Sequence, residues 1–232
     1  MTASVPAGGG FNRQGQLALF GGYDLPVLNV TAECRSRDFV APAKALGLPP
    51  FALLLYALAK ASLEVENFRY RLQDGDVQVV TRLTASYTLL DRNENLNFSN
   101  VPFDADWRVF LERYLAEREV ARHSSLLEAA PLPNRDFIFV TCLPWLRFTS
   151  IQHPIARLGD TSIPSFAAGR FERSGGEVTF PLSVQAHHGL VDGLHIHRLM
   201  ACVEGELAQL TGALGAQAGS LPGPGLTPGS GT

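Results

Sequence analysis

Two adjacent histidines, His187 and His188, and an aspartate four positions after the second, Asp192, form the densest group of reactive side chains in the sequence. An imidazole titrates near neutral pH and can accept a proton from a hydroxyl group, so either histidine could serve as a general base. The apolar residues before them predict a β-strand, in which neighbouring side chains point to opposite faces. Only one histidine can therefore face a given cleft, and the other is structural. Alternation alone permits either assignment.

The Asp192-Gly193 pair has a second interpretation, because aspartate is a preferred residue immediately before the first turn of a helix. Its carboxylate would then accept backbone N–H groups, and the glycine would relax the backbone. Taken alone, the pair favours this structural role. His195 and His197 follow two residues apart, a spacing that places them on different faces of a helix and argues against a metal site.

Three helices are predicted around these residues. The first is an apolar segment with proline at its start (48–63), and the second can be capped by Asp104 or Asp106 (104–122). The third follows Asp192, carries an apolar stripe and ends at Gly212.

Five strands are predicted from runs of β-branched and aromatic residues, at 26–33, 76–88, 136–142, 165–172 and 177–185. The glycines within 173–177 predict a hairpin turn between the last two strands. One antiparallel hairpin and the lack of a regular βαβ rhythm favour a two-layer α/β fold, with a mixed β-sheet covered by helices, over a Rossmann fold.

Composition excludes several classes of protein. The chain has 232 residues, is 46% hydrophobic and carries 19 Lys plus Arg against 22 Asp plus Glu. The net charge of -3 and the absence of a basic block argue against nucleic acid and anionic lipid as partners. Three cysteines without CxxC spacing argue against a disulfide framework and a zinc site, and fit a reducing cytoplasm.

The sequence predicts one domain, at residues 11–212. Residues 1–10 are expected to be flexible. Residues 213–232 are rich in Gly and Pro and are expected to form a disordered tail. The N-terminal residues lack the pattern of a secretion signal, and no run is long enough for a membrane span, so we expect a cytoplasmic protein.

Two segments carry a family resemblance. HHGLVDG fits the HHxxxDG signature of coenzyme A dependent acyltransferases, and its surroundings (180–199) resemble the form of that signature in the chloramphenicol acetyltransferase family. FVTCLPWLRFTSI (139–151) resembles the family segment in which a hydroxyl residue precedes a small residue and LPW. Looser matches, at FNRQGQ (11–16), LPPFALLLYALAKA (48–61) and FRYRLQDGDVQVV (68–80), occur in the family's order.

The resemblance implies catalytic roles. His188 would be the general base, with its tautomer held by a backbone carbonyl, and Asp192 would organise the site by pairing with Arg13. Thr141 stands where the family has an oxyanion-binding serine, so the hydroxyl is retained and a methyl group is added. The alternative for Thr141 is an ordinary strand threonine.

The resemblance also implies an acceptor site, where this chain departs furthest from the family. Phe20 replaces a tyrosine, Ile151 replaces a phenylalanine and Ala167 replaces a threonine. Such substitutions alter which acceptor fits without affecting proton transfer. The expected acceptor-binding residues are Leu19, Phe20, Ile151, His153, Ile155 and Ala167.

For the acyl donor, the resemblance implies acetyl-CoA as co-substrate, in a tunnel lined by Trp145, Arg170 and Phe171. The structural alternatives are a core aromatic for Trp145 and a surface cation for Arg170. The family assembles as a homotrimer with each active site between subunits, so self-association is expected. No metal cofactor is expected.

The expected function is acetyl-CoA dependent O-acetylation of chloramphenicol, which inactivates the antibiotic, with His188 as general base. Two alternatives stay open: an acyltransferase that acts on another hydroxyl compound, and a family member that has lost turnover.

Overall fold

The computed structural model describes residues 4–124, 135–155 and 161–219. Its main sheet has the strand order β2 (Val27–Arg37), β10 (Glu177–His187), β8 (Ser165–Ala168), β7 (Phe137–Cys142), β5 (Thr84–Leu90) and β6 (Leu96–Pro102), and β9 (Glu172–Ser174) also pairs with β10. The β8–β7 and β7–β5 pairs are parallel and the others are antiparallel. The prediction of a mixed sheet is confirmed.

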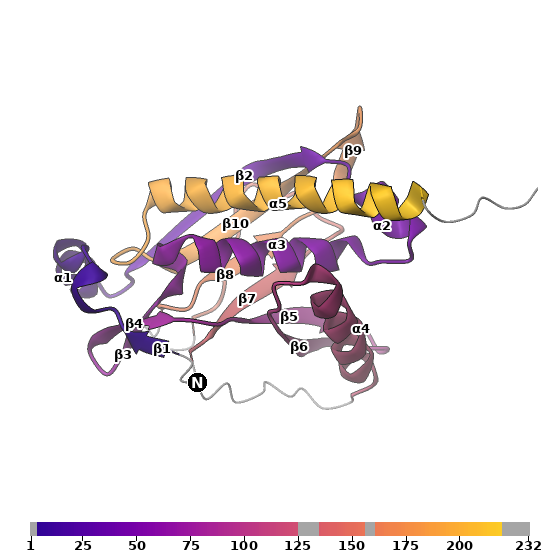
Figure 1. Ribbon diagram of the computed structural model, residues 1–232. Helices are drawn as coiled ribbons and strands as arrows, with labels where there is room; N and C mark the ends of the chain where they lie inside the picture. The colour runs from indigo at the N-terminus through magenta and orange to yellow at the C-terminus, as the bar shows by residue number, and fades with distance from the viewer. Residues whose placement is uncertain (1–3, 125–134, 156–160, 220–232) are drawn as a thin grey trace, which may run out of the picture.

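Helices cover one face of this sheet, as Figure 1 shows. The long α5 (Gly193–Gly219) lies beside α3 (Pro50–Glu64), and α4 (Trp107–His123) packs against β5 and β6. The short α2 (Val40–Ala45) contacts both α3 and α5, and α1 (Gln14–Gly21) lies at the far end of the sheet. Sheet and helices thus form the two expected layers.

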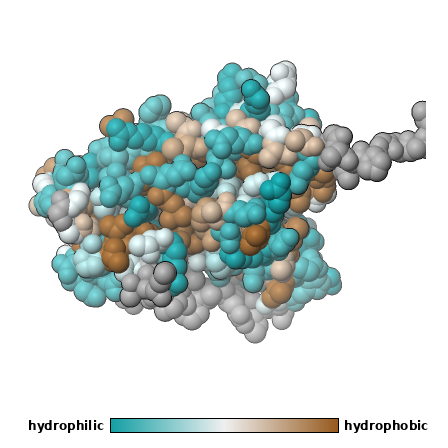
Figure 2. Space-filling view, viewed as in Figure 1, coloured by the Kyte–Doolittle hydropathy of each residue, from teal (hydrophilic) through white to brown (hydrophobic). Residues whose placement is uncertain are grey.

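The hydrophobic core lies between these layers, and α3 contributes much of it. Nearly every residue from Ala52 to Ser62 is buried, which is why this segment is apolar on all sides. Asp106 caps α4 by accepting a hydrogen bond from the Arg108 N–H, as the sequence predicted. Hydrophilic residues predominate on the outer surface of the helical layer, with hydrophobic patches between them (Figure 2).

A second, smaller sheet includes part of the N-terminal segment 1–10, which the sequence predicted to be flexible. Its strands are β1 (Ser4–Pro6), β4 (Asp76–Val80) and β3 (Tyr70–Gln73), and the 3-10 turns η1 (Gly8–Gly10) and η2 (Glu66–Arg69) lie next to it. Without β1, one edge of β4 would present unpaired backbone N–H and C=O groups. β1 pairs with this edge in antiparallel register. Residues 1–3 lie outside the described residues.

Two predicted strands are each divided. The run 76–88 becomes β4 and β5, because the chain passes from the small sheet to the main sheet between Val80 and Thr84. The run 165–172 breaks at Gly169, where a Cβ atom would lie 2.4 Å from Pro181 Cγ and 2.7 Å from the Leu146 carbonyl oxygen. The Gly169 N–H still donates to the Pro181 carbonyl oxygen at 2.9 Å, but Pro181 has no N–H group to donate in return, so the ladder between β10 and β8 is interrupted there.

The last helix is longer than predicted. α5 runs to Gly219 and passes Gly212, where the sequence predicted its end and the start of the tail. Leu214 lies one helical turn after Leu210 and both are buried, so the apolar stripe continues across the glycine. Residues 220–232 lie outside the described residues. Within the described part of the chain, no helix has the length and apolarity to span a bilayer.

Candidate active site

His188 lies in the turn that joins β10 to α5, and its ring is held by one hydrogen bond and one stacking contact. Its Nδ1 atom is 3.1 Å from the Val191 carbonyl oxygen. Since a carbonyl can only accept, this contact requires the proton on Nδ1 and leaves a lone pair on Nε2. The ring of Phe20, from α1, stacks on the imidazole with 3.9 Å between centroids. The half-buried His188 therefore presents Nε2 as a base in a fixed orientation.

His187, the last residue of β10, has a different environment. It is only 4% exposed, and its Nδ1 accepts a hydrogen bond from the Gly189 N–H at 3.0 Å. Burial, together with the neighbouring His188, lowers the pKa of His187, so its ring is neutral near pH 7. Of the two histidines, His187 has the structural environment.

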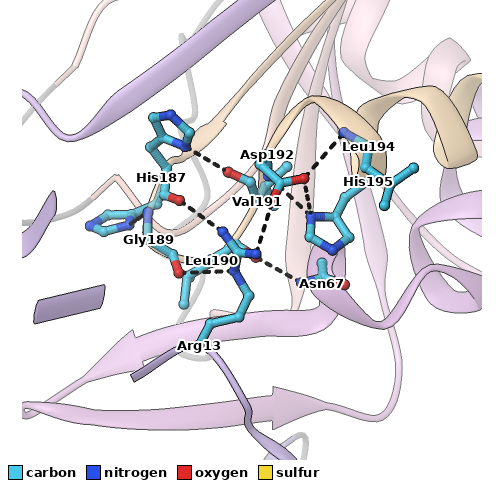
Figure 3. Close-up of polar contacts among 10 residues, drawn as sticks. Arg13, Asn67, His187, Gly189, Leu190, Val191, Asp192, Leu194 and His195 are labelled. Carbon is cyan, nitrogen blue, oxygen red and sulfur yellow. Dashed lines mark hydrogen bonds and ion pairs between the residues drawn. The ribbon is translucent and has the colours of Figure 1, made fainter. Parts of the chain in front are cut away.

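Arg13 connects the N-terminal segment to this turn (Figure 3). It is 7% exposed, and its Nη1 atom lies 2.9 Å from Asp192 Oδ2. Its other nitrogens donate to the carbonyl oxygens of Gly189, at 3.2 Å, and His188, at 3.3 Å. One buried guanidinium thus fixes three points of the turn, a geometry that lysine could not reproduce.

Asp192 combines the two roles that the sequence left as alternatives. Its Oδ1 accepts from the Leu194 N–H at the start of α5, and its Oδ2 pairs with Arg13. Burial alone would raise the pKa of Asp192, but the Arg13 hydrogen bond and the nearby His195 outweigh burial and lower it. The carboxylate stays ionised and serves as a helix cap and as an ion-pair partner.

Two further residues secure the turn, and sequence reasoning did not assign them this role. His195 Nδ1 lies 2.9 Å from Asp192 Oδ1, and the Asn67 amide donates to the Leu190 carbonyl oxygen at 2.8 Å. The spacing of three residues between Asp192 and His195 was visible as a helical neighbour pair. Asn67 comes from η2, far away in sequence, and no local pattern marks it.

Two cavities share Thr141, in β7, as a lining residue. The first cavity, of about 550 Å³, is lined by Thr141, His153 and Ile155 together with residues from β5, β6 and β10. The second cavity, of about 590 Å³, is lined by Thr141, Trp145, Arg170 and Phe171, and by three further cations, Lys44, Arg118 and Arg173. Thr141 lines both cavities, and its Oγ1 atom lies 3.3 Å from Thr88 Oγ1.

The other predicted acceptor residues are not all part of these cavities. Leu19 is 58% exposed on α1, beside Phe20. The Ile151 backbone carbonyl accepts a hydrogen bond from the Asn29 side chain. Ala167 is fully buried in β8, opposite Thr141, and lines neither cavity.

Strand register shows that one chain does not bring His188 and Thr141 together. Thr141 lies opposite Ala167, which lies opposite Ser183 of β10. His188 follows Ser183 by five residues, so the Cα atoms of His188 and Thr141 are separated by two strand spacings across the sheet and five residues along it, about 19 Å. His188 also lines neither cavity. Among the described residues, no cluster of side chains could hold a metal ion.

Comparisons with known proteins agree on one family. The family model described as "Chloramphenicol acetyltransferase" matches residues 11–204. A chloramphenicol acetyltransferase of Campylobacter coli is 28% identical over 164 residues, which cover 69% of this chain and 79% of that protein. One of Bacillus pumilus is 29% identical over 150 residues, which cover 64% of this chain and 68% of that protein.

Solved structures show the same fold. A chloramphenicol acetyltransferase aligns with a TM-score of 0.78 at 24% identity, over 85% of this chain and 95% of that one. A probable dihydrolipoamide acetyltransferase from Listeria monocytogenes aligns with a TM-score of 0.60 at 12% identity, over 84% and 89% of the two chains. The family model covers most of the chain, and therefore this protein belongs to the chloramphenicol acetyltransferase family.

Proposed function

We propose that this protein transfers the acetyl group of acetyl-CoA to a hydroxyl group of chloramphenicol and so inactivates the antibiotic. The observation that carries the proposal is the state of His188, whose Nδ1–H donates to the Val191 carbonyl and whose Nε2 is left as a base. Membership of the family supplies the acceptor and the type of reaction.

In the proposed reaction, His188 Nε2 accepts the proton of the acceptor hydroxyl as the hydroxyl oxygen attacks the thioester carbonyl carbon. The Val191 carbonyl stabilises the imidazolium that forms, because it accepts from Nδ1–H. His188 then returns the proton to the departing coenzyme A sulfur. Arg13 and Asp192 touch no reacting atom in this scheme and position the turn that carries His188.

Thr141 is proposed to donate its hydroxyl hydrogen to the oxyanion of the tetrahedral intermediate. Its position supports this role, because it is shared by the two cavities and an acceptor in one would meet a thioester in the other there. A single well-placed donor of this kind contributes about 3 kcal/mol to transition-state stabilisation.

The second cavity fits acetyl-CoA. Lys44, Arg118, Arg170 and Arg173 supply positive charge for phosphate groups, and the apolar surfaces of Trp145 and Phe171 suit the rest of the molecule. Arg170 and Arg173 already pair with Glu172 and Asp38, so Lys44 and Arg118 are better placed to meet a phosphate.

We further propose that the active site forms between copies of the chain in a homotrimer. The support is the separation of about 19 Å between His188 and Thr141 within one chain, whereas a general base must act within about 3 Å of its proton. In a closed trimer, His188 of one copy would face the cavities of its neighbour.

The acceptor is tested by following coenzyme A thiol release from acetyl-CoA, with and without chloramphenicol. The proposal expects release that depends on chloramphenicol, and a panel of other alcohols should give lower kcat/KM values. A better acceptor in that panel would replace chloramphenicol in the assignment. No release with any acceptor would indicate a member of the family that has lost turnover.

The shared site is tested by co-expressing His188→Ala and Thr141→Ala chains. Each variant alone should be almost inactive, but a mixed trimer pairs an intact His188 with an intact Thr141 at one of its three interfaces. Random mixing in equal amounts therefore restores about a quarter of wild-type activity. If the mixture stays as inactive as the separate variants, the active site does not lie between chains.

A further inference from the structure

Arg71, in β3, is a buried cation that donates to four backbone carbonyl groups within the described chain. It is only 1% exposed. Its Nη1 atom donates to the Phe68 and Tyr70 carbonyl oxygens, at 2.9 and 2.8 Å. Its Nε and Nη2 atoms donate to the Arg135 and Phe137 carbonyl oxygens, at 2.7 and 2.9 Å. Burial lowers the pKa of Arg71 to about 9, so the guanidinium is charged at pH 7, and these bonds offset the cost of burying it.

The turn that Arg71 holds, η2, carries Asn67. Asn67 Nδ2 lies 2.8 Å from the Leu190 carbonyl oxygen in the β10–α5 turn (Figure 3). A carbonyl oxygen can only accept, so the NH2 group of the amide must face it. The next residue, Phe68, is fully buried, and its carbonyl is one of those that Arg71 binds. Asn67 therefore donates from a backbone that is fixed.

The hydrogen bond from Asn67 helps to fix the orientation of one peptide group. The carbonyl of this group, on Leu190, accepts from Asn67, and its N–H, on Val191, donates to the His187 carbonyl oxygen at 2.9 Å. The two polar groups of a trans peptide point in opposite directions in one plane, so the two bonds together set the plane. Val191 then presents the carbonyl that holds the Nδ1 proton of His188.

The neighbouring carbonyls of the β10–α5 turn have other donors. Arg13 donates to the carbonyls of His188 and Gly189, and backbone N–H groups of α5 donate to that of Asp192. In the part of the chain that the structure describes, Asn67 thus supplies a contact to this turn that Arg13 does not make. Since Leu190 is 1% exposed, loss of the Asn67 amide would leave a buried carbonyl without this donor.

We infer that Asn67 is a positioning residue for His188, and that Arg71 acts through Asn67 by fixing η2. Asn67 touches no reacting atom. It orients the peptide group next to the Val191 carbonyl, which in turn sets the tautomer and the direction of the His188 ring. The inference rests on the proposed function in one respect, namely that His188 is the general base.

Kinetic measurements test the role of Asn67. Asn67→Ala should lower kcat about tenfold and leave KM near its wild-type value, because the orientation of the base affects the transition state and not the binding of substrates. Asn67→Asp keeps the shape of the side chain but replaces the donor by an acceptor, so it should lose at least as much. Glu66→Gln, at an exposed site in the same turn, is the matched control. Full kcat in Asn67→Asp would overturn the inference.

The direct test reads the tautomer of His188 from the ¹⁵N signals of its ring in the full-length protein. His188→Gln identifies these signals by their loss. In wild type and in Glu66→Gln, the proton should lie on Nδ1. In Asn67→Ala it should lie partly on Nε2, because the carbonyl that selects Nδ1 is no longer held in place. A His188 ring that keeps its tautomer in both Asn67 variants overturns the inference.

The NMR readout separates the inference from the proposed function, because it does not require turnover. A change of tautomer in a protein that transfers no acetyl group would support the inference and contradict the proposed function. Acetyl transfer by the wild type, with an unchanged tautomer in Asn67→Ala, would keep the proposed function and overturn the inference.

Arg71→Lys tests whether Arg71 acts through Asn67. Lysine keeps the positive charge, but its ammonium cannot reproduce the planar fork that binds four carbonyls. We expect kcat to fall by up to about tenfold, and the double variant with Asn67→Ala should lose no more than Asn67→Ala alone. Losses that multiply would overturn the role of Arg71. Arg71→Gln, which removes the charge but keeps two N–H donors, provides the same comparison if the lysine variant does not fold.

Discussion

Two regions of this protein each contain histidine side chains, but the histidines of the two regions differ in their hydrogen bonding. In the His188 loop (residues 187–195), both histidines, Asp192 and the surrounding carbonyls have partners within the chain. In the first cavity, the imidazole of His153 is buried with its Nε2 unpaired in the described structure. The His188 ring is oriented by a hydrogen bond within the chain, whereas the His153 ring leaves a buried nitrogen unpaired among the described residues.

The difference indicates a division between catalysis and recognition. A general base needs a fixed tautomer and orientation before the substrate arrives, and the chain itself supplies both. The first cavity is proposed to hold the acceptor, and its lining is mostly apolar, so it contributes to binding rather than to proton transfer. Substitutions in the His188 loop should therefore reduce kcat, and those in the first cavity should change acceptor affinity.

The largest expected effect is at His188. His188→Ala removes the base while leaving the Arg13–Asp192 pair in place, and we expect kcat to fall about 1,000-fold, within the range for general-base catalysis. Steady-state thiol release measures this loss, and His197→Ala, an exposed site on the nearby helix α5, is the matched control. A loss below tenfold would assign proton transfer to another group and remove the distinction between the two regions.

Thr141 tests the distinction between catalysis and recognition. It lies in the wall of both cavities but is proposed to act on the transition state. Thr141→Ala should lower kcat about 100-fold with little change in KM, and Thr141→Ser should stay near wild type because it keeps the hydroxyl. If Thr141→Ala retains full kcat, Thr141 is an ordinary strand threonine and the oxyanion donor lies elsewhere.

Much of this structure could be predicted from the sequence wherever local pattern decides it. The apolar run of α3, the capped α4 and the glycine hairpin before β10 each carry a strong local signal. By contrast, α1 buries no residue and contains two glycines, and β6 is rich in Asn and Ser, so neither has a periodic apolar pattern. Their formation depends on packing against the rest of the chain.

The site divides in the same way. The motif drew attention to His188 and Asp192, but only the family resemblance implied that Asp192 pairs with Arg13, 179 positions earlier. Asn67 and Arg71 carried no local signal, because their importance comes from which atoms the fold brings together. Spacing identifies residues that could do chemistry, and tertiary packing determines which of them have a free atom.

A substitution at Gly189 should have a smaller effect on kcat, because it displaces the His188 loop without removing a catalytic group. A Cβ atom at this position would lie 2.9 Å from Leu17 Cα and 2.9 Å from His187 Cε1, so Gly189→Ala must displace α1 or the His188 loop. We expect a loss of about 2 kcal/mol in the free energy of unfolding and about a tenfold loss in kcat.

Gly193→Ala is the matched control, because nothing lies within 4 Å of a Cβ atom there. Denaturant unfolding and thiol release on both variants measure the effects, and Gly193→Ala should stay within about 0.5 kcal/mol of wild type. Equal behaviour of the two variants would show that the His188 loop tolerates displacement, contrary to the rigid arrangement described above.

The smallest expected effect is a pH dependence of stability from His187. Its pKa in the folded protein is lowered by burial and by His188, and its Nδ1 must stay unprotonated to accept the Gly189 N–H. A lowered folded pKa means that the unfolded chain binds more protons, so this contribution is present above about pH 6.5 and is lost as the pH falls towards the folded pKa. His187→Gln keeps an acceptor oxygen but does not titrate.

Unfolding free energies of wild type and His187→Gln between pH 5 and 7 should therefore converge at the acid end, with slopes that differ by at most about one proton. The difference between the two proteins isolates His187, because His153 and His195, whose pKa values burial also lowers, are present in both. His197→Gln should run parallel to wild type. Parallel curves for His187→Gln as well would mean that His187 keeps its ordinary pKa in the fold, and the Gly189 N–H would then need another acceptor.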